Sequence, residues 1–251
     1  MGLTHSLVGK DGFRLRGIEM SRVDGFSDVV FGFALTLIVA SLEVPKTFSE
    51  LHEVLVGFVP FAVSFVLFMM VWLSHFRFFR RFGLHDLGTI LINAGLLFSV
   101  LFYVYPLKFL FRVFTSQLMG QQIAADTFAN SEQIRELVIV YGLGFAAIYF
   151  FLFLLNLHAW RLRSELDLNR LELVILKSEY VDLAVVCGIG LVVAALATMT
   201  SARSSPNACF AFFLIGIWKT VSGFYFGKRI RNMRETAHGS TEPPVHEPLP
   251  G

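Results

Sequence analysis

The chain of 251 residues is 55% hydrophobic and only 16% charged, and its mean hydropathy is +0.65. A water-soluble fold of this size could not cover so much apolar surface with so few charged side chains, so the composition excludes that class. The formal net charge of +2 gives no basis for binding nucleic acid, which needs Lys and Arg clustered on a folded face. The sequence therefore predicts an integral membrane protein that contacts lipids.

Six apolar runs follow one another along the chain, and about 20 such residues in a helix span a bilayer core. The first run is short unless the polar residues in front of it are included, and the sixth contains Lys219. We interpret Lys219 as extending to the membrane interface. The runs predict an all-α bundle of six transmembrane helices over residues 23–44, 54–76, 87–107, 136–157, 180–202 and 206–227.

Local signals mark where the first two helices begin and end. Ser21 with Asp24, and Thr47 with Glu50, have the spacing of a capping box in front of an apolar run. Pro45 lies where the first helix is expected to end. These signals support helix starts close to the beginnings of the first and second runs.

The distribution of Lys and Arg predicts the orientation of the bundle. Outside the spans, fifteen of these residues fall on the side of the N-terminus and five on the other side. We therefore expect both termini to be cytosolic, which requires an even number of spans. Residues 1–21 form a short cytosolic N-terminal segment, and residues 228–251 form a cytosolic tail that is first basic and then Pro-rich, with disorder expected over residues 238–251.

Polar residues gather at one depth of the predicted bundle. Asp28 lies within the first run, and an ionisable residue at membrane depth points by default to a function. His75 ends the second run and Asn93 lies about 9 Å along the third, so both share the level of Ser27 and Asp28. We expect a hydrogen-bonded network among them, to which Trp72 can add its indole N–H. A purely structural role for Asp28, holding the bundle together, is equally open.

The stretch from Arg22 to Asp28 reads R-x-x-x-F-S-D. It resembles the signature of the endosomal and lysosomal potassium channel family, in the prokaryotic branch that has one six-helix repeat per chain. The resemblance continues through FSDVVFGFALTLIVASLEVP and includes Trp72-x-x-His75, Asp86 and Asn93. It implies a homotetramer whose first helices line the pore, without a re-entrant pore loop or a TVGYG filter. This sequence contains neither.

The resemblance also implies roles for individual residues. One group of residues is assigned to a packed network behind the pore wall: Arg22, Phe26, Ser27, Asp28, Trp72, His75 and Asn93. The resemblance assigns to a hydrophobic constriction Phe33, Leu37 and Ala40, with Thr36 nearby. Residues 33, 37 and 40 share one helix face, although ordinary packing against lipid or another helix fits this spacing equally well. The sequence departs from the family at Phe33, where Ile or Leu is usual, and at Ala40, where Leu is usual.

These observations predict a potassium-permeable cation channel in the cell membrane, that is, the inner or plasma membrane. The alternative is a proton- or ion-coupled transporter that uses Asp28 and His75. An intramembrane hydrolase is disfavoured because Ser27 and Asp28 point about 100° apart on one helix, and no nucleophile elbow surrounds Ser27. The chain has no CxxC or HExxH motif, so we expect no metal site and no cofactor beyond permeant potassium.

Overall fold

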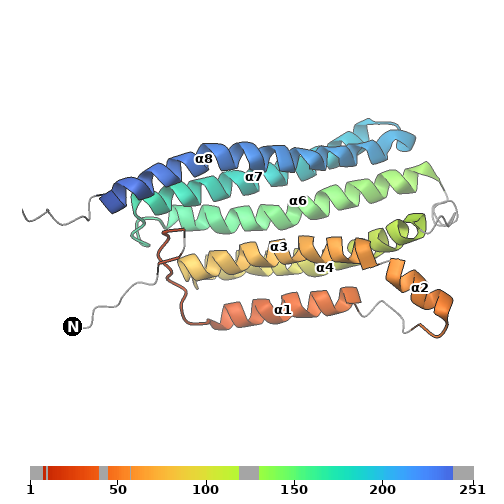
Figure 1. The fold of residues 1–251 in the computed structure, drawn as a ribbon, viewed down its shortest axis with the longest axis horizontal. Coiled ribbons are helices and arrows are strands. Elements are labelled where there is room, and N and C mark those ends of the chain that lie inside the picture. The colour runs from red at the N-terminus through yellow and green to blue at the C-terminus, as the bar shows by residue number, and fades with distance from the viewer. Residues whose placement is uncertain (1–7, 10, 40–44, 57, 119–129, 240–251) are drawn as a thin grey trace, which may run out of the picture.

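The structure is a computed structural model, and it describes residues 8–9, 11–39, 45–56, 58–118 and 130–239. These residues form helices and connections and contain no strand beyond an isolated bridge between Val8 and Arg14. The long helices run side by side along one axis, while α2 diverges from them (Figure 1). The elements are α1 (Arg22–Val39), α2 (Phe48–Val56), α3 (Phe58–Phe82), α4 (Leu87–Leu118), α6 (Ser131–Arg161), α7 (Arg170–Met199), the 3₁₀ helix η1 (Ala202–Phe212) and α8 (Phe213–Gly239).

Within the described residues, five helical stretches are long and apolar enough to cross a bilayer. They are Phe61–Phe82, Leu87–Leu107, Ser131–Arg161, Arg170–Met199 and Ser204–Met233. Helix α1 is not among them because its 18 residues include Arg22, Asp24 and Asp28. The structure therefore supports an all-helical membrane protein. The remaining span, predicted over residues 23–44, stays a prediction.

Several helices differ in extent from the predicted runs. Residues 54–76 are divided between α2, which ends at Val56, and α3, which begins at Phe58. Helices α4, α6 and α7 continue beyond the apolar runs, and 30 residues of helix measure about 45 Å against a hydrocarbon core of about 30 Å. Helix α8 includes residues 228–239 of the predicted tail, and the Pro-rich end from residue 240 lies outside the described residues.

The capping signals correspond to hydrogen bonds. Asp24 N donates to Ser21 Oγ at 3.1 Å, and Ser21 N donates to the Asp24 carboxylate at 3.0 Å, which confirms the predicted capping box. Glu50 N donates to Thr47 Oγ1 at 3.2 Å, but the Glu50 carboxylate accepts from Lys46 N instead of Thr47 N. Both sets of bonds satisfy backbone groups that a helix start leaves without partners.

Packing joins the helices in a continuous series. Helix α1 contacts α3 and α4, α6 contacts α4 and α7, and α7 contacts α8. Helices α6 and α7 approach closely because glycines face each other. A Cβ placed on Gly142 would lie 2.8 Å from the Gly190 carbonyl oxygen. Small residues of this kind let two backbones pack tightly where lipid gives no hydrophobic driving force.

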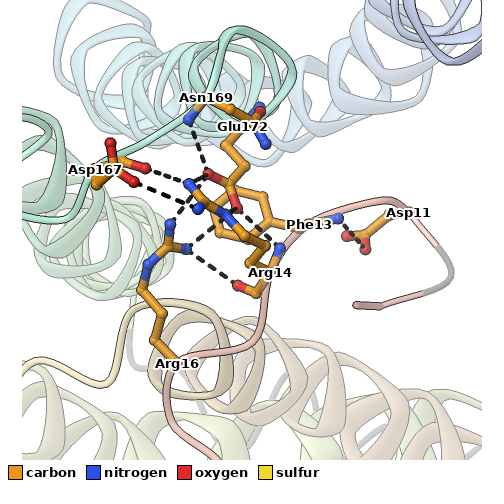
Figure 2. A network of polar contacts seen from close by, with 7 residues as sticks. All are labelled: Asp11, Phe13, Arg14, Arg16, Asp167, Asn169 and Glu172. Atoms are coloured by element: carbon orange, nitrogen blue, oxygen red, sulfur yellow. Dashed lines mark hydrogen bonds and ion pairs between the residues drawn. The ribbon is translucent and has the colours of Figure 1, made fainter. Parts of the chain in front are cut away.

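Residues 11–20, which we call the N-terminal strap, join α3 and α7 at one end of the bundle (Figure 2). The buried carboxylate of Glu172, in the first turn of α7, accepts hydrogen bonds from the backbone N–H, Nε and Nη2 of Arg14. It also accepts from both terminal nitrogens of Arg16 at 3.1 and 3.3 Å and from Asn169 N at 2.9 Å. The hydrogen bonds to Glu172 raise the pKa of Arg14.

Phe13 and Arg81 attach the strap to the end of α3. The fully buried ring of Phe13 packs edge to face on Phe82, with a centroid separation of 5.4 Å, and the Arg81 guanidinium lies 5.1 Å from the Phe13 ring centre. Arg81 also forms ion pairs with Glu179 and, at 2.5 Å, with Asp11. Although burial alone would raise the pKa of Asp11, Arg81 lowers it. Three segments, the strap, α3 and α7, thus meet at the Arg81 guanidinium and the Phe13 ring.

Gly17 is required where the strap touches α3. Its backbone N–H donates to the Arg80 carbonyl oxygen at 3.1 Å. A Cβ at this position would lie 2.2 Å from the Phe79 carbonyl oxygen, closer than any contact allows. The strap therefore lies directly on the backbone of α3.

We predict that Glu172→Gln destabilises the protein by about 3 kcal/mol, since it leaves two arginines facing a neutral group in a partly buried site. The measurement is thermal unfolding in detergent, and Glu165→Gln is the matched control because Glu165 is exposed. Equal unfolding midpoints for the two variants would contradict a stabilising role for this ion-pair cluster.

Candidate functional site

Helix α1 has two faces of opposite character. Ser27, Phe31 and Ala34 follow i, i+4, i+7 spacing and are buried against the rest of the chain. Phe26 and Phe33 are 64% and 57% exposed. One face of α1 therefore belongs to the bundle, and its other face carries large apolar side chains that no part of the described chain covers.

The buried face of α1 joins a chain of hydrogen bonds with α3 and α4. His75 Nε2 lies 2.9 Å from Asn93 Oδ1, Asn93 Nδ2 donates to Ser27 Oγ at 2.8 Å, and Ser27 Oγ donates to the Val23 carbonyl oxygen at 2.7 Å. All three side chains are at least 98% buried. The bonds run through apolar surroundings, where an unpaired polar group is costly.

The directions of these bonds indicate that Nε2 of His75 carries a hydrogen. Ser27 uses its only hydrogen on Val23, so it accepts from the Asn93 amide N–H. The Asn93 oxygen then faces His75 and can only accept, so His75 Nε2 carries a hydrogen. His75 Nδ1 is buried and has no hydrogen-bond partner. The network thus leaves one polar ring atom unused.

Asp28 joins α1 to α3 through a different bond. Trp72 Nε1 donates to Asp28 Oδ1 at 2.9 Å, and the Trp72 ring stacks on Phe76 with a centroid separation of 5.4 Å. The stacking fixes the plane of the indole and so directs its N–H. Five residues proposed from the sequence, Ser27, Asp28, Trp72, His75 and Asn93, are therefore brought together by the fold.

Other proposed residues lie apart from this network. Arg22 and Phe26 are exposed, and no hydrogen bond or ion pair in the described chain connects Arg22 to it. Phe33 and Thr36 lie on the exposed face of α1, whereas Leu37 is partly buried against the core. Ala40 lies outside the described residues. Residues 33 and 37 are about one helical turn apart and were expected on the same face, but they differ in exposure.

Asp86, which belongs to the same resemblance, supports the start of α4. Its carboxylate accepts from Thr89 N at 3.2 Å and Thr89 Oγ1 at 2.6 Å, and it lies 2.8 Å from His158 Nε2 on α6. Burial alone would raise the pKa of Asp86, but the hydrogen bonds from Thr89 and His158 lower it to about 2. Asp86 is therefore an N-cap that also connects two helices.

The sequence interpretation missed a second polar cluster, between α7 and α8. The Asp182 carboxylate accepts from Trp218 Nε1 at 3.0 Å, Lys219 Nζ at 3.0 Å and Ser222 Oγ at 2.6 Å. Lys219 thus pairs with an acidic residue, where we had expected it to extend to the interface. The signal was available, because Trp218 and Ser222 have i, i+4 spacing and Asp182 is an ionisable residue within a predicted span.

The arrangement offers hydrogen bonding and charge but no evident reaction. In the part of the chain that the structure describes, no three His, Cys, Asp or Glu residues are grouped so that they could hold a metal ion. Ser27 donates to a backbone carbonyl and accepts from an amide, so it has no adjacent base. The geometry is that of a positioning network for α1.

Sequence comparisons identify similar proteins over most of the chain. The family described as endosomal/lysosomal potassium channel TMEM175 matches residues 22–103. A potassium channel of Marivirga tractuosa is 33% identical over 231 residues, which are 88% of this chain and 93% of the relative. A potassium channel of Chamaesiphon minutus is 30% identical over 96 residues, 35% of this chain and 47% of the relative.

Two solved structures resemble the fold. The crystal structure of a variant of the potassium channel MtTMEM175, bound to a nanobody–MBP fusion, has a TM-score of 0.77 at 31% identity and covers 88% of this chain and 100% of the other. A lysosomal potassium-selective channel TMEM175 homologue from Chamaesiphon minutus has a TM-score of 0.52 at 26% identity and covers 83% of this chain and 96% of the other.

We predict that Trp72→Phe lowers the stability of the folded protein by about 2 kcal/mol, because it keeps the aromatic stack and removes the N–H donor to Asp28. Thermal unfolding in detergent measures the change. Trp160→Phe is the control, since no side chain among the described residues accepts a hydrogen bond from the Trp160 indole N–H. If both variants unfold at the same temperature, the Asp28–Trp72 bond contributes nothing to positioning α1.

Proposed function

Because this chain belongs to the TMEM175 family of endosomal/lysosomal potassium channels, we propose that it is a potassium-permeable cation channel. The similarity to a potassium channel extends over nearly nine tenths of the chain at 33% identity. The related proteins are ion channels and not enzymes.

We further propose that the functional unit is a homotetramer in which four copies of α1 surround a shared axis. The observation that carries this proposal is the exposed apolar face of α1, formed by Phe26, Val29 and Phe33. A single chain leaves this face uncovered, and four copies around an axis would cover it and enclose a path. The buried face, with Ser27 and Asp28, would then hold each α1 in place from behind.

Phe33 is the residue we assign to the constriction. It is 57% exposed, one helical turn beyond Val29 on the same face. Four copies would form a ring of phenyl groups, and a narrow apolar ring can close a path by excluding water. Rotated rings can instead present their faces to a passing cation. Leu37 and Ala40 continue the stripe with smaller contributions, because Leu37 is partly buried and Ala40 is small.

The network behind α1 supports a positioning role for Asp28 more than a role in permeation. Asp28 bonds to Trp72 on α3 and lies on the side of α1 that faces the bundle. The charge bias of the sequence supports six spans, with α1 as the first and both termini in the cytosol. It also supports residence in the cell membrane, where the basic segments meet anionic lipids.

We predict that the purified protein, reconstituted in planar bilayers, carries a cation current whose reversal potential with potassium and sodium on opposite sides reports preference for potassium. Phe33→Ala should raise the current because it opens the narrowest ring. Phe98→Ala is the matched control, since Phe98 is a phenylalanine of similar exposure on α4.

An unchanged current in Phe33→Ala, or an equal increase in Phe98→Ala, would remove Phe33 from the conduction path. Flux coupled in fixed stoichiometry to a proton gradient would favour the transporter alternative.

We also predict a tetramer when the protein is examined by native mass spectrometry in detergent. Four copies bury the exposed face of α1, so the assembly should survive release from the micelle. Spectra that contain only monomers or dimers would contradict the shared axis, whereas a failure of the current alone would leave the assembly intact.

A further inference from the structure

Helix α8 belongs to the membrane-spanning stretch that the rest of the described chain covers least. Only 6% of the apolar part of this stretch is buried, against 28–39% in the other four candidate spans. The helix is attached to the bundle through the hydrogen bonds of the Asp182 cluster and, further along, through Ile230, which packs against the buried core. These contacts hold α8 by one side, so its opposite side faces outward.

The outward side of α8 changes from apolar to basic along a single row of side chains. Ile217, Val221 and Phe224 follow i, i+4, i+7 spacing and are 62%, 54% and 78% exposed. The same spacing continues to Lys228 and Arg231, which are also exposed. We call these five residues the α8 stripe. Its basic end lies at the end of the bundle where the strap crosses α3 and where α7 begins (Figure 1).

The length of the α8 stripe matches one leaflet of a bilayer. The helical rise from Ile217 to Lys228 is about 16 Å, and one leaflet contributes about 15 Å of hydrocarbon. Tyr225, which is 66% exposed beside the stripe, has the amphipathic ring that is typical of the boundary between hydrocarbon and headgroups. A phospholipid whose acyl chain lies along the apolar part of the stripe therefore has its headgroup beside Lys228.

The charges at the basic end of the stripe are not neutralised within the described chain. This end of α8 has one acidic residue, Glu235, against Lys228, Arg229, Arg231 and Arg234. Lys228, Arg229 and Arg231 form no ion pair with another described residue. Residues three positions apart on a helix have Cβ atoms about 5–6 Å apart, so Lys228 and Arg231 can donate to one phosphate group together.

The two parts of the stripe together fit a lipid and not a soluble anion. A soluble anion would contact Lys228 and Arg231 and leave the exposed Phe224 uncovered, although Phe224 lies about one turn away on the same face. A phosphatidylcholine would cover Phe224 but would bring its own cationic group against the two basic side chains. A phospholipid with a net negative charge matches both parts of the stripe.

We propose that the α8 stripe binds an anionic phospholipid of the leaflet at this end of the bundle. The lipid phosphate accepts hydrogen bonds from Lys228 and Arg231, and an acyl chain lies against the apolar part of the stripe. Because the bundle holds α8 from the other side, the bound lipid stabilises the position of this helix. The proposal concerns lipid binding and does not depend on conduction.

The test uses the full-length protein in an uncharged detergent, with dioleoylphosphatidylglycerol as the probe and the thermal unfolding midpoint as the readout at constant ionic strength. Dioleoylphosphatidylcholine is the control lipid, because it has the same acyl chains and no net charge. Inorganic phosphate supplies the anion without acyl chains. We expect a saturable rise of the midpoint with dioleoylphosphatidylglycerol and much smaller changes with the control lipid and with phosphate.

Two double variants locate the site. Lys228→Gln with Arg231→Gln removes both charges of the stripe, so we expect the apparent affinity to fall roughly thirtyfold. Arg77→Gln with Arg161→Gln is the matched control, because it removes the same charge from exposed residues of α3 and α6, helices that do not contact α8 within the described chain. The control should bind like the unmodified protein, and unfolding without lipid shows that each variant is folded.

An equal rise with the two lipids, or the same rise with phosphate alone, would overturn the proposal. So would an unchanged Kd in the Lys228→Gln and Arg231→Gln variant, or an equal loss of affinity in the control variant, since basic residues anywhere at this end of the bundle would then account for binding. Saturable binding by a protein that carries no current would support the lipid site and would contradict only the channel.

Discussion

The requirement that buried polar groups find partners governs the position of α1. This helix carries Ser27 and Asp28 into apolar surroundings, where unpaired groups destabilise the fold. Ser27, Asn93 and His75 can share their hydrogen bonds because α1, α3 and α4 meet at a single level, and each hydrogen bond fixes the direction of the next. Hydrophobic contacts alone would let the helix rotate or slide, since lipid and Leu are equally apolar. The hydrogen bonds remove that freedom.

Fixing one face of α1 determines what its other face can do. Because Ser27, Phe31 and Ala34 point into the bundle, the helical repeat turns Phe26, Val29 and Phe33 away from it. No described part of the chain covers those side chains. A conduction path shared between subunits requires a helix of this kind, with one face fixed to its own subunit and the opposite face free to line the path. The strap adds to the same rigidity, because it attaches the end of α3, which carries His75, to α7 through Glu172 and Arg81.

The depth of a residue along a helix can be calculated from the sequence. The rotation of the helix about its own axis, and the pairing of residues far apart in the chain, are much harder to predict. Residue spacing times helical rise puts Asp28, His75 and Asn93 at one level, and the structure joins these helices there. The outward direction of Phe26 does not follow from the motif, in which it is the neighbour of buried Ser27, and only packing determines it. The pairing of Glu172 with Arg14 spans 158 residues, and no periodicity in the chain indicates it.

Asp28 and Asp182 both lie between helices, and they differ in the side chains that pair with them. Asp28 and Asp182 each accept a hydrogen bond from a tryptophan, Trp72 and Trp218 respectively. Asp182 also accepts hydrogen bonds from Lys219 and Ser222, so a cation balances its charge and both of its oxygens have partners. The Lys219 side chain is half exposed, so this ion pair is reached by solvent or lipid headgroups. Asp28 has no hydrogen bond or ion pair to a cation among the described residues, although Arg80 and Asp28 line one pocket at the start of α1. Its bond to Trp72 attaches α1 to α3, so the position of Asp28 depends on a neutral donor, whereas that of Asp182 depends on a tryptophan and a lysine together.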